Sequence, residues 1–443
     1  MQKFVYGHII LHKCPDMKMQ GNRRLWSIRV LPLSFWSAEN TAWADISLPV
    51  ALHPGQELYL DVGQVLYGLA ELHFSCEEIC HVHMCVAETL WALQDEQTEE
   101  HEYKGQGKYP LMLGQQVLRF IRLKVHKPCF LMNLSLWSRA DPLFPACPVS
   151  NERMEGMWLN ACSVVSFCWQ EGLWLVPSLR AAADVYSVWV LGPAVFLLAG
   201  VVQDWKDNLK NLLAQYDRKE WLEDSPMASL WFFLCLGEYH QHTKDDDFFA
   251  QHGPRIKAKL DALLHNCRNN GRIQCPSESD ESLWGRIFAS DSEEILMAQQ
   301  TTLFWVLGVI KHLVFHLGWM EQFVKIERFL AMREEFWLFP QTQSGAALAV
   351  LGDLPDRRYF FLPQMNQNHD NLSAIEMALL ALALAKKNEI QAGRDILQEY
   401  WLGKSALYPP AAENPYRPIK DAYILSAWDA MPINLIPILY TQH

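Results

Sequence analysis

Basic residues are scarce in this sequence. Its 443 residues include 38 lysines and arginines against 50 aspartates and glutamates, which gives a formal net charge of −12 at pH 7. Proteins that bind DNA or RNA neutralise phosphates with clustered Lys and Arg, so we expect no nucleic-acid partner. The sequence also lacks an apolar run of the roughly 20 residues that a membrane-spanning helix needs. Its most apolar stretches, residues 188–202 and 375–385, predict buried helices and no membrane partner.

Several common catalytic signatures are absent. The sequence contains no Gly-x-Ser-x-Gly, no His-Glu-x-x-His, no glycine-rich phosphate-binding loop and no dinucleotide-binding fingerprint. The corresponding serine hydrolases, zinc proteases and nucleotide-dependent enzymes are therefore disfavoured, and we expect no cofactor. The segments His240-Gln241-His242 and 245–247 are polar or acidic, and we interpret them as a solvated helix end followed by a loop.

The cysteines do not form a disulfide framework. There are 11 of them, an odd number without regular spacing, and the first residues lack the form of a secretory signal, so we expect a reduced, cytoplasmic protein. Cys76, Cys80, His81, His83 and Cys85 crowd together, and the last three would share one face of a strand. Because their spacing matches no common structural zinc pattern, we expect ordinary strand residues and no metal.

Two halves of the chain differ in hydrophobic pattern. Short β-branched or aromatic segments, separated by Pro, Gly and polar clusters, are typical of an antiparallel β-sandwich. These segments are 30–36, 57–63, 69–76, 81–88 and 118–125. After a Pro-rich linker, apolar residues return at i, i+3 and i+4, which predicts helix after helix. The predicted helices are 151–171, 180–202, 205–217, 226–242, 254–269, 292–317, 320–334, 343–351, 371–386 and 389–402. We therefore predict a β-sandwich domain over 1–145 and a domain of helical hairpins over 146–443.

Residues 158–192 join two predicted helices through an aromatic connection that contains Pro177. This layout resembles the signature of the α-L-rhamnosidase family of six-hairpin glycosidases, in which Asp-x-Pro-x-Arg-Glu/Asp-Arg leads to Trp-x-Gly-Asp. With Pro177 as the anchor, Leu175 stands at the first Asp, Arg180 at the general acid and Ser187 at the last Asp. The frame of the motif is present, whereas its carboxylates are replaced.

Further segments resemble the same family in the same order. They are DVGQVLYGLAELHF at 61–74, SPMASLWFFLCLGEYHQHTKDDDFF at 225–249, QTQSGAALAVLGDLPD at 341–356 and the stretch 372–401 that ends in Tyr-Trp. The resemblance implies a β module beside an (α/α)6-type six-hairpin toroid. It also implies inverting hydrolysis of terminal rhamnose or a related deoxysugar. The helical half is short for six full hairpins, so a trimmed or incomplete toroid is an alternative.

Inverting hydrolysis needs two carboxyl groups about 6.5 to 9.5 Å apart. The resemblance places the catalytic base near Glu413, for which an exposed loop glutamate is the alternative. Asp184 is the only acid left in the signature segment and is the candidate acid, with Glu171 as a second. Asp184 lies one helical turn past Arg180, and pairing with that cation would lower a carboxyl pKa, whereas a general acid needs it raised.

Candidate sugar-binding residues are Arg180, Trp174, Trp284 and Trp428. Arginine cannot release a proton near neutral pH, but its planar fork holds carboxylates or hydroxyls. Each tryptophan alternatively fills a core, as large aromatic residues usually do. Two functions therefore remain open: a rhamnosidase-like hydrolase that acts on a carbohydrate ligand, and a non-catalytic carbohydrate-binding or scaffold protein, a pseudo-glycosidase. A homodimer is compatible with the aromatic content, although no segment marks its surface.

Overall fold

The structure, a computed structural model, describes most of the chain from Ile10 to Tyr440. The described residues are 10–12, 19–20, 23–24, 26–29, 33–37, 44–46, 48–55, 57–87, 101–138, 146–149, 151–170, 173–176, 181–182, 184–217, 226–266, 292–335, 340–356, 359–367, 369, 372–402 and 430–440. They form two compact units: one holds the strands up to Ser138 and the other the helices from Glu152 onward. Each unit is described by itself.

The first unit is an antiparallel sheet. Its strands are β1 (Ile10–His12), β4 (Trp26–Arg29), β5 (Leu33–Ser37), β6 (Ala44–Ile46), β7 (Val50–Leu52), β8 (Glu57–Ala87), β9 (His101–Val125) and β10 (Cys129–Ser138). The order along the sheet is β1-β4-β10-β8-β5-β6, with β7 paired to β10 and β9 paired to β8. A separate pair consists of β2 (Met19–Gln20) and β3 (Arg23–Arg24).

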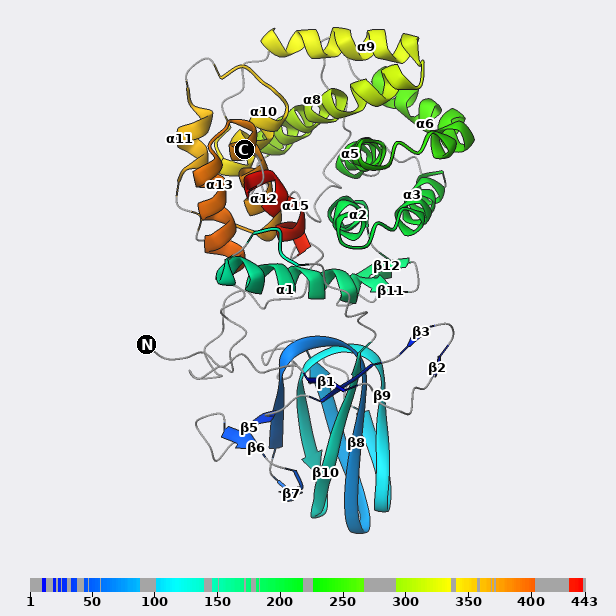
Figure 1. Cartoon of the computed structure of the whole chain (residues 1–443), viewed down its shortest axis with the longest axis vertical. Coiled ribbons are helices and arrows are strands. Elements are labelled where there is room, and N and C mark those ends of the chain that lie inside the picture. Colours follow the sequence, from blue (N-terminus) through cyan, green and yellow to red (C-terminus); the bar gives the residue numbers. More distant parts are fainter. Residues whose placement is uncertain are drawn as a thin grey trace. The chain divides into compact units, whose positions relative to one another are not determined.

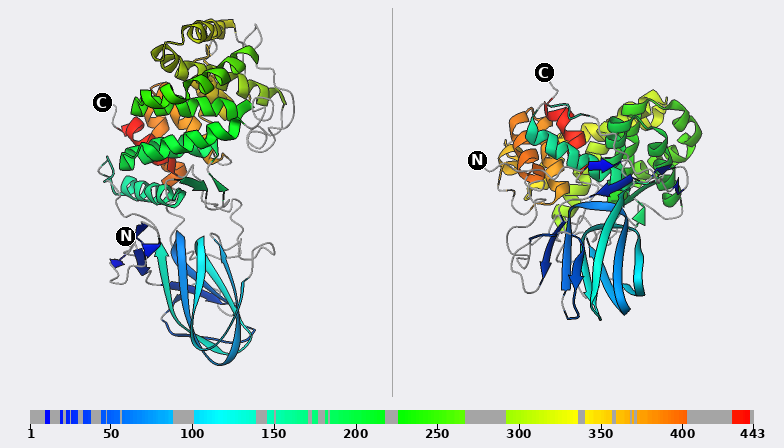
Figure 2. Two further views of the ribbon diagram at one scale, coloured as in Figure 1. Left: turned by 90° about the vertical axis from the view of Figure 1, so that its right-hand side faces the viewer. Right: turned by 60° about the horizontal axis from the view of Figure 1, so that its bottom comes forward.

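Strands β8 and β9 make the sheet curl. They run side by side as long antiparallel strands (Figure 2), and β9 pairs with β8 twice: residues 120–124 with 57–61, and residues 120–125 with 82–87. The segments 57–63, 69–76 and 81–88 are expected as separate strands, but residues 57–87 form one 31-residue strand. The residues between these segments do not end the strand, because shifts in the register of β8 against β9 accommodate them. Alternate side chains such as Leu72, Phe74 and Val82 fill the apolar core.

The second unit is helical. Its α-helices are α1 (Glu152–Cys168), α2 (Val185–Ala199), α3 (Gln203–Tyr216), α5 (Pro226–Thr243), α6 (Asp246–Asn266), α8 (Ser292–His316), α9 (Met320–Ala331), α10 (Gln343–Leu351), α11 (Phe361–Met365), α12 (Ala374–Lys386), α13 (Ile390–Leu397) and α15 (Met431–Tyr440). Short 3₁₀ and π turns, η3 (Met332–Glu335) and η4 (Gln398–Leu402), extend α9 and α13. Strands β11 (Trp169–Gln170), β12 (Leu173–Val176) and β13 (Ala181–Ala182) lie between α1 and α2.

Six helices of this unit form a closed series of contacts (Figure 1). Helix α2 packs against α5, α5 against α8, α8 against α10, α10 against α12, α12 against α15, and α15 returns to α2. Helices α3, α9, α11 and α13 each contact one or two members of this ring. The expected antiparallel sheet and helix-rich second half are present, whereas the sandwich and toroid arrangements stay predictions. Among the described residues, no helix combines the length and apolarity needed to cross a bilayer.

Local sequence explains where several ring helices begin. Thr342 caps α10 by accepting a hydrogen bond from Gly345 N at 3.0 Å. Ser373 and Glu376 form a reciprocal capping box on α12. The helix predicted from residue 254 instead begins at Asp246, so that boundary is wrong. Proline is favoured in the first turn of a helix, but here Pro254 lies inside α6.

Candidate functional site

The connection between α1 and α2 holds the described part of the expected sugar site. Strands β11 and β12 pair with Trp169 opposite Trp174, and β12 contacts α1, α2 and α3. The Trp169 indole Nε1 donates a hydrogen bond to Asp204 Oδ2 at 2.5 Å. This bond fastens the hairpin of β11 and β12 to α3.

Asp184 stands at the start of α2 and caps it. Its Oδ1 accepts a hydrogen bond from the Ser187 backbone N–H at 2.7 Å, and the aspartate is exposed, whereas Ser187 is buried. An N-cap carboxylate satisfies one of the unpaired N–H groups of the first helical turn. The side chain therefore has an evident structural use, and its role as a general acid stays a prediction.

The other candidate residues lie outside the described part of the chain. They are Glu171, Arg180, Trp284, Glu413 and Trp428. The expected pairing of Arg180 with Asp184 and the expected carboxyl pair around Glu413 are accordingly still predictions.

An aromatic cluster joins three neighbouring helices of the ring. Trp189 of α2, Trp231 of α5 and Trp305 of α8 meet edge to face, with centroid separations of 4.8, 5.8 and 5.9 Å. Tyr186 adds a fourth ring, 5.4 Å from Trp231. All three tryptophans are buried, and edge-to-face aromatic pairs stabilise packing beyond the area they bury. These three tryptophans therefore fill the core of the helical unit and do not line an exposed sugar site.

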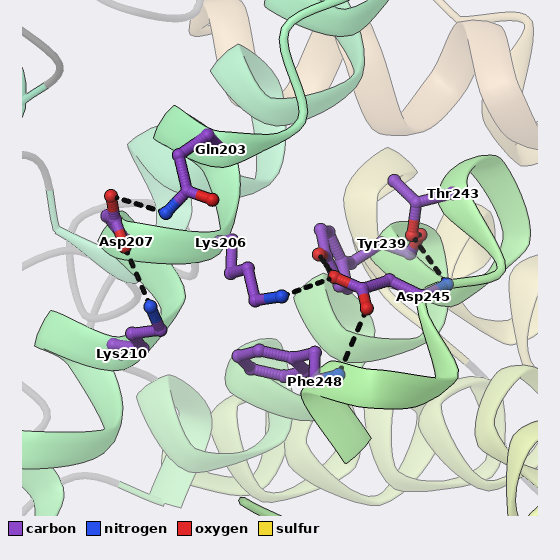
Figure 3. Close-up of polar contacts among 8 residues, drawn as sticks. All are labelled: Gln203, Lys206, Asp207, Lys210, Tyr239, Thr243, Asp245 and Phe248. Carbon is purple, nitrogen blue, oxygen red and sulfur yellow. Dashed lines mark hydrogen bonds and ion pairs between the residues drawn. The ribbon is translucent and has the colours of Figure 1, made fainter. Parts of the chain in front are cut away.

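The corner between α5 and α6 is a polar network (Figure 3). Asp245 accepts hydrogen bonds from Tyr239 Oη at 2.5 Å and from the Phe248 backbone N–H at 3.0 Å, and its Oδ2 lies 2.9 Å from Lys206 Nζ. Burial raises the pKa of Asp245, but the bonds from Tyr239 and Lys206 outweigh it and hold the pKa below its usual value. Asp245 is thus an anionic cap that ties α3, α5 and α6 together.

Next to this corner, two imidazoles and a carboxylate converge. His240 of α5, Asp246 of α6 and His316 of α8 place ligand atoms within 4.8 Å of one another. His240 is buried and its Nε2 has no hydrogen-bond partner, so the interpretation of this segment as a solvated helix end is wrong for His240. Burial, Lys244 and His316 lower the pKa of His240, which favours the neutral imidazole that metals bind. These three residues could hold a divalent transition-metal ion.

A second potential ligand set lies in the sheet unit. The thiols of Cys76, Cys80 and Cys129 come within 4.8 Å of one another, and all three residues are buried. Cys76 and Cys80 are close together in the sequence, whereas Cys129 is distant in sequence and is brought to them by the pairing of β10 with β8. Other histidine and cysteine residues of the segment 76–85 have different hydrogen-bond partners. His83 meets His126 at 2.8 Å, and Cys85 accepts a hydrogen bond from Arg122 Nη2 at 3.0 Å.

No family model and no curated protein sequence matches this chain. Several solved structures, in contrast, are similar to it. A rhamnosidase from Klebsiella oxytoca with rhamnose bound superposes with a TM-score of 0.74 at 14% identity, over 93% of this chain and 95% of that chain. The fold is that of the α-L-rhamnosidases.

Two further rhamnosidase-fold structures agree. A family GH78 rhamnosidase of Bacillus sp. GL1 gives a TM-score of 0.69 at 14% identity, over 89% of this chain and 48% of that chain. The Streptomyces avermitilis α-L-rhamnosidase complexed with L-rhamnose gives 0.60 at 13% identity, over 90% and 44%. The chain therefore spans about half the length of these two proteins. At such low identity the likeness establishes the rhamnosidase fold, and function is a separate inference.

Proposed function

We propose that this protein is a rhamnosidase-like glycoside hydrolase that takes a terminal L-rhamnose or a related deoxysugar. The observation that carries the proposal is the fold shared with the rhamnose-bound Klebsiella oxytoca enzyme over nearly the whole length of both chains. In this proposal Arg180, Trp174, Trp284 and Trp428 contact the sugar. The reaction inverts the anomeric centre, with Glu413 activating water.

The proposed architecture is a β-sandwich over 1–145 followed by an (α/α)6-type toroid over 146–443. The curled antiparallel sheet supports the first part. The closed series of contacts from α2 through α5, α8, α10 and α12 to α15 supports the second, because an inner ring of alternate helices is the core of such a toroid. A ring of this kind leaves its helix ends and loops free to form a ligand site.

A non-catalytic sugar-binding protein is the second candidate. Leu175, Arg180 and Ser187 stand at the three carboxylate positions of the family motif, and Asp184, the acid that remains between Leu175 and Ser187, caps α2. Leucine and serine cannot act as general acids, and arginine holds its proton near neutral pH. The sugar pocket would then bind without cleaving, with Arg180 donating hydrogen bonds to hydroxyls or to an anionic group.

Two measurements on the purified full chain separate the candidates. Calorimetric titration with L-rhamnose tests binding, and release of aryl alcohol from an aryl α-L-rhamnoside tests turnover. The hydrolase proposal expects both, with turnover lost in Glu413→Gln and binding kept. Binding without turnover above background would favour the second candidate, and the absence of both would overturn the sugar proposal.

Asp184→Asn tests the candidate acid without removing the helix cap. Asparagine caps helices about as well as aspartate, so the stability of α2 is kept while the acid is lost. Turnover that disappears at unchanged melting temperature would assign a catalytic role to Asp184. Turnover that persists would leave Asp184 as a cap alone.

A further inference from the structure

The three buried thiols of the sheet unit lie together because of a specific irregularity in β8. Four residues of an extended strand span about 13 Å, which would keep Cys76 and Cys80 apart. Here the register of β8 against β9 shifts between them: Cys76 pairs with Gly107 and Cys80 with Gly105. Four residues of β8 thus face two of β9, and the intervening 77–79 are exposed. This bulge folds outward and brings the two cysteines to one place.

Strand β10 delivers the third thiol. Its register pairs Leu131 with Phe74 and Phe130 with Ser75, so the next position along places Cys129 opposite Cys76. Phe74 and Leu131 are buried, and side chains two residues apart on a strand share a face. Cys76 and Cys129 therefore point into the same core.

The cluster has the dimensions and chemistry of a thiolate metal site. A Zn–S distance of about 2.3 Å places the sulfurs of a tetrahedral site about 3.8 Å apart, and these thiols lie within 4.8 Å of one another. Oxygen atoms border the cluster: Tyr109 Oη lies 4.0 Å from Cys76 Sγ, and the Lys127 carbonyl lies 3.2 Å from Cys80 Sγ. Soft sulfur ligands select Zn²⁺ or Cu⁺ over hard cations.

We propose that Cys76, Cys80 and Cys129 bind one thiophilic metal ion, of the class of Zn²⁺ and Cu⁺, that fastens the β8 bulge to β10. Each thiol releases its proton to solvent as its metal–sulfur bond forms. A disulfide would use only two of the three sulfurs and leave the third thiol beside it. The site is independent of the sugar proposal, since it lies wholly in the sheet unit.

The test uses the full chain, purified under reducing conditions, stripped with a chelator and titrated with Zn²⁺, Co²⁺ or Cu⁺ alone. We expect one ion per chain bound through sulfur, seen as sulfur-to-cobalt charge-transfer absorption, and loss of that absorption in Cys129→Ser. Cys85→Ser removes a buried thiol of the same strand and should keep it, and His316→Gln should keep it while removing ions held near His240. The Zn²⁺ and Cu⁺ arms show which ion binds more tightly.

Two results would overturn the site: no sulfur-bound ion in the reduced wild type, or a disulfide among the three cysteines that persists under these reducing conditions. Should Cys129→Ser fail to fold, the wild type still decides the question. Peptide mapping after alkylation in mild denaturant should show Zn²⁺ protecting Cys76, Cys80 and Cys129 together, and leaving Cys235 unchanged. Equal alkylation of the three with and without Zn²⁺ would refute the proposal.

Discussion

Replacing Asp245 with alanine should loosen the corner between α3, α5 and α6 (Figure 3). The change removes the N-cap of α6, which costs about 1 kcal/mol. It also leaves the hydroxyl of Tyr239, a fully buried residue, without its acceptor, at a cost of roughly 1–3 kcal/mol. Together, the lost cap and the lost acceptor should lower the free energy of unfolding by about 2–4 kcal/mol. In a unit of this size, that corresponds to a drop of about 4–8 °C in melting temperature.

Asp207 of α3 supplies a matched control in a separate group of polar contacts (Figure 3). It accepts hydrogen bonds from Gln203 at 2.8 Å and from Lys210 at 2.9 Å, but its side chain is 44% exposed. Exposed pairs of this kind contribute little, so Asp207→Ala should cost about 0.5 kcal/mol or less. Thermal unfolding followed by circular dichroism measures both variants. Equal losses for Asp245→Ala and Asp207→Ala would refute the assignment of Asp245 as the anchor of this corner.

The charge of Asp245 also predicts a dependence on pH. Its pKa in the folded protein lies below the ordinary value of 3.8, so its ionised form stabilises the fold fully above that value. This contribution is lost as the pH falls through the folded pKa. Asp245→Asn keeps the cap and removes the charge. The difference in unfolding free energy between wild type and Asp245→Asn should therefore be constant from pH 7 to about 5 and shrink below about 4. A difference that grows on acidification would contradict this sign.

Further predictions concern the helical ring. Glu376→Ala removes the acceptor of the buried Ser344 hydroxyl, 2.9 Å away, together with the capping box of α12, and should cost about 2–3 kcal/mol in chemical denaturation. At Gly192 of α2, an added Cβ would lie 2.2 Å from the ring of buried Trp205, so Gly192→Ala should destabilise by about 1–3 kcal/mol. At Gly308 of α8, nothing lies within 4 Å, so Gly308→Ala should stabilise by about 0.5–1 kcal/mol. Melting temperatures that shift in the same direction for the two glycine variants would contradict this contrast.

Helices were the most predictable part of the fold. The predicted segments 226–242, 292–317 and 343–351 lie within one residue of α5, α8 and α10 at each end. Their apolar periodicity and caps are local, so a single segment carries the whole signal. The start of α6 was missed because Asp245, a loop acid in the sequence, is the cap, and Pro254 is tolerated inside the helix.

Strands were less predictable because pairing is non-local. Breaks such as the acidic pair Glu77-Glu78 suggest separate strands, whereas the partner strand keeps the segments in one ladder. In the expected sugar site, the sequence predicts only an aromatic connection with Pro177 between two helices, and the pairing of β11 with β12 just before that proline is not part of the prediction. The start of α2 was expected at 180, but the cap at Asp184 places it at Val185.

The feature least predictable from a single segment is the convergence of potential metal ligands that lie far apart in the sequence. His240 and Asp246 are close in sequence, but the packing of α5 against α8 brings His316 to them. Cys76 and Cys80 are also neighbours, and Cys129 joins them through the register of β10 against β8. A register slip by one residue would turn Cys129 to the other face of the sheet, so the thiol cluster depends on the pairing of Phe130 with Ser75. Metal binding at this cluster would therefore report on the register of the sheet, and a shift of β10 by one residue would abolish it.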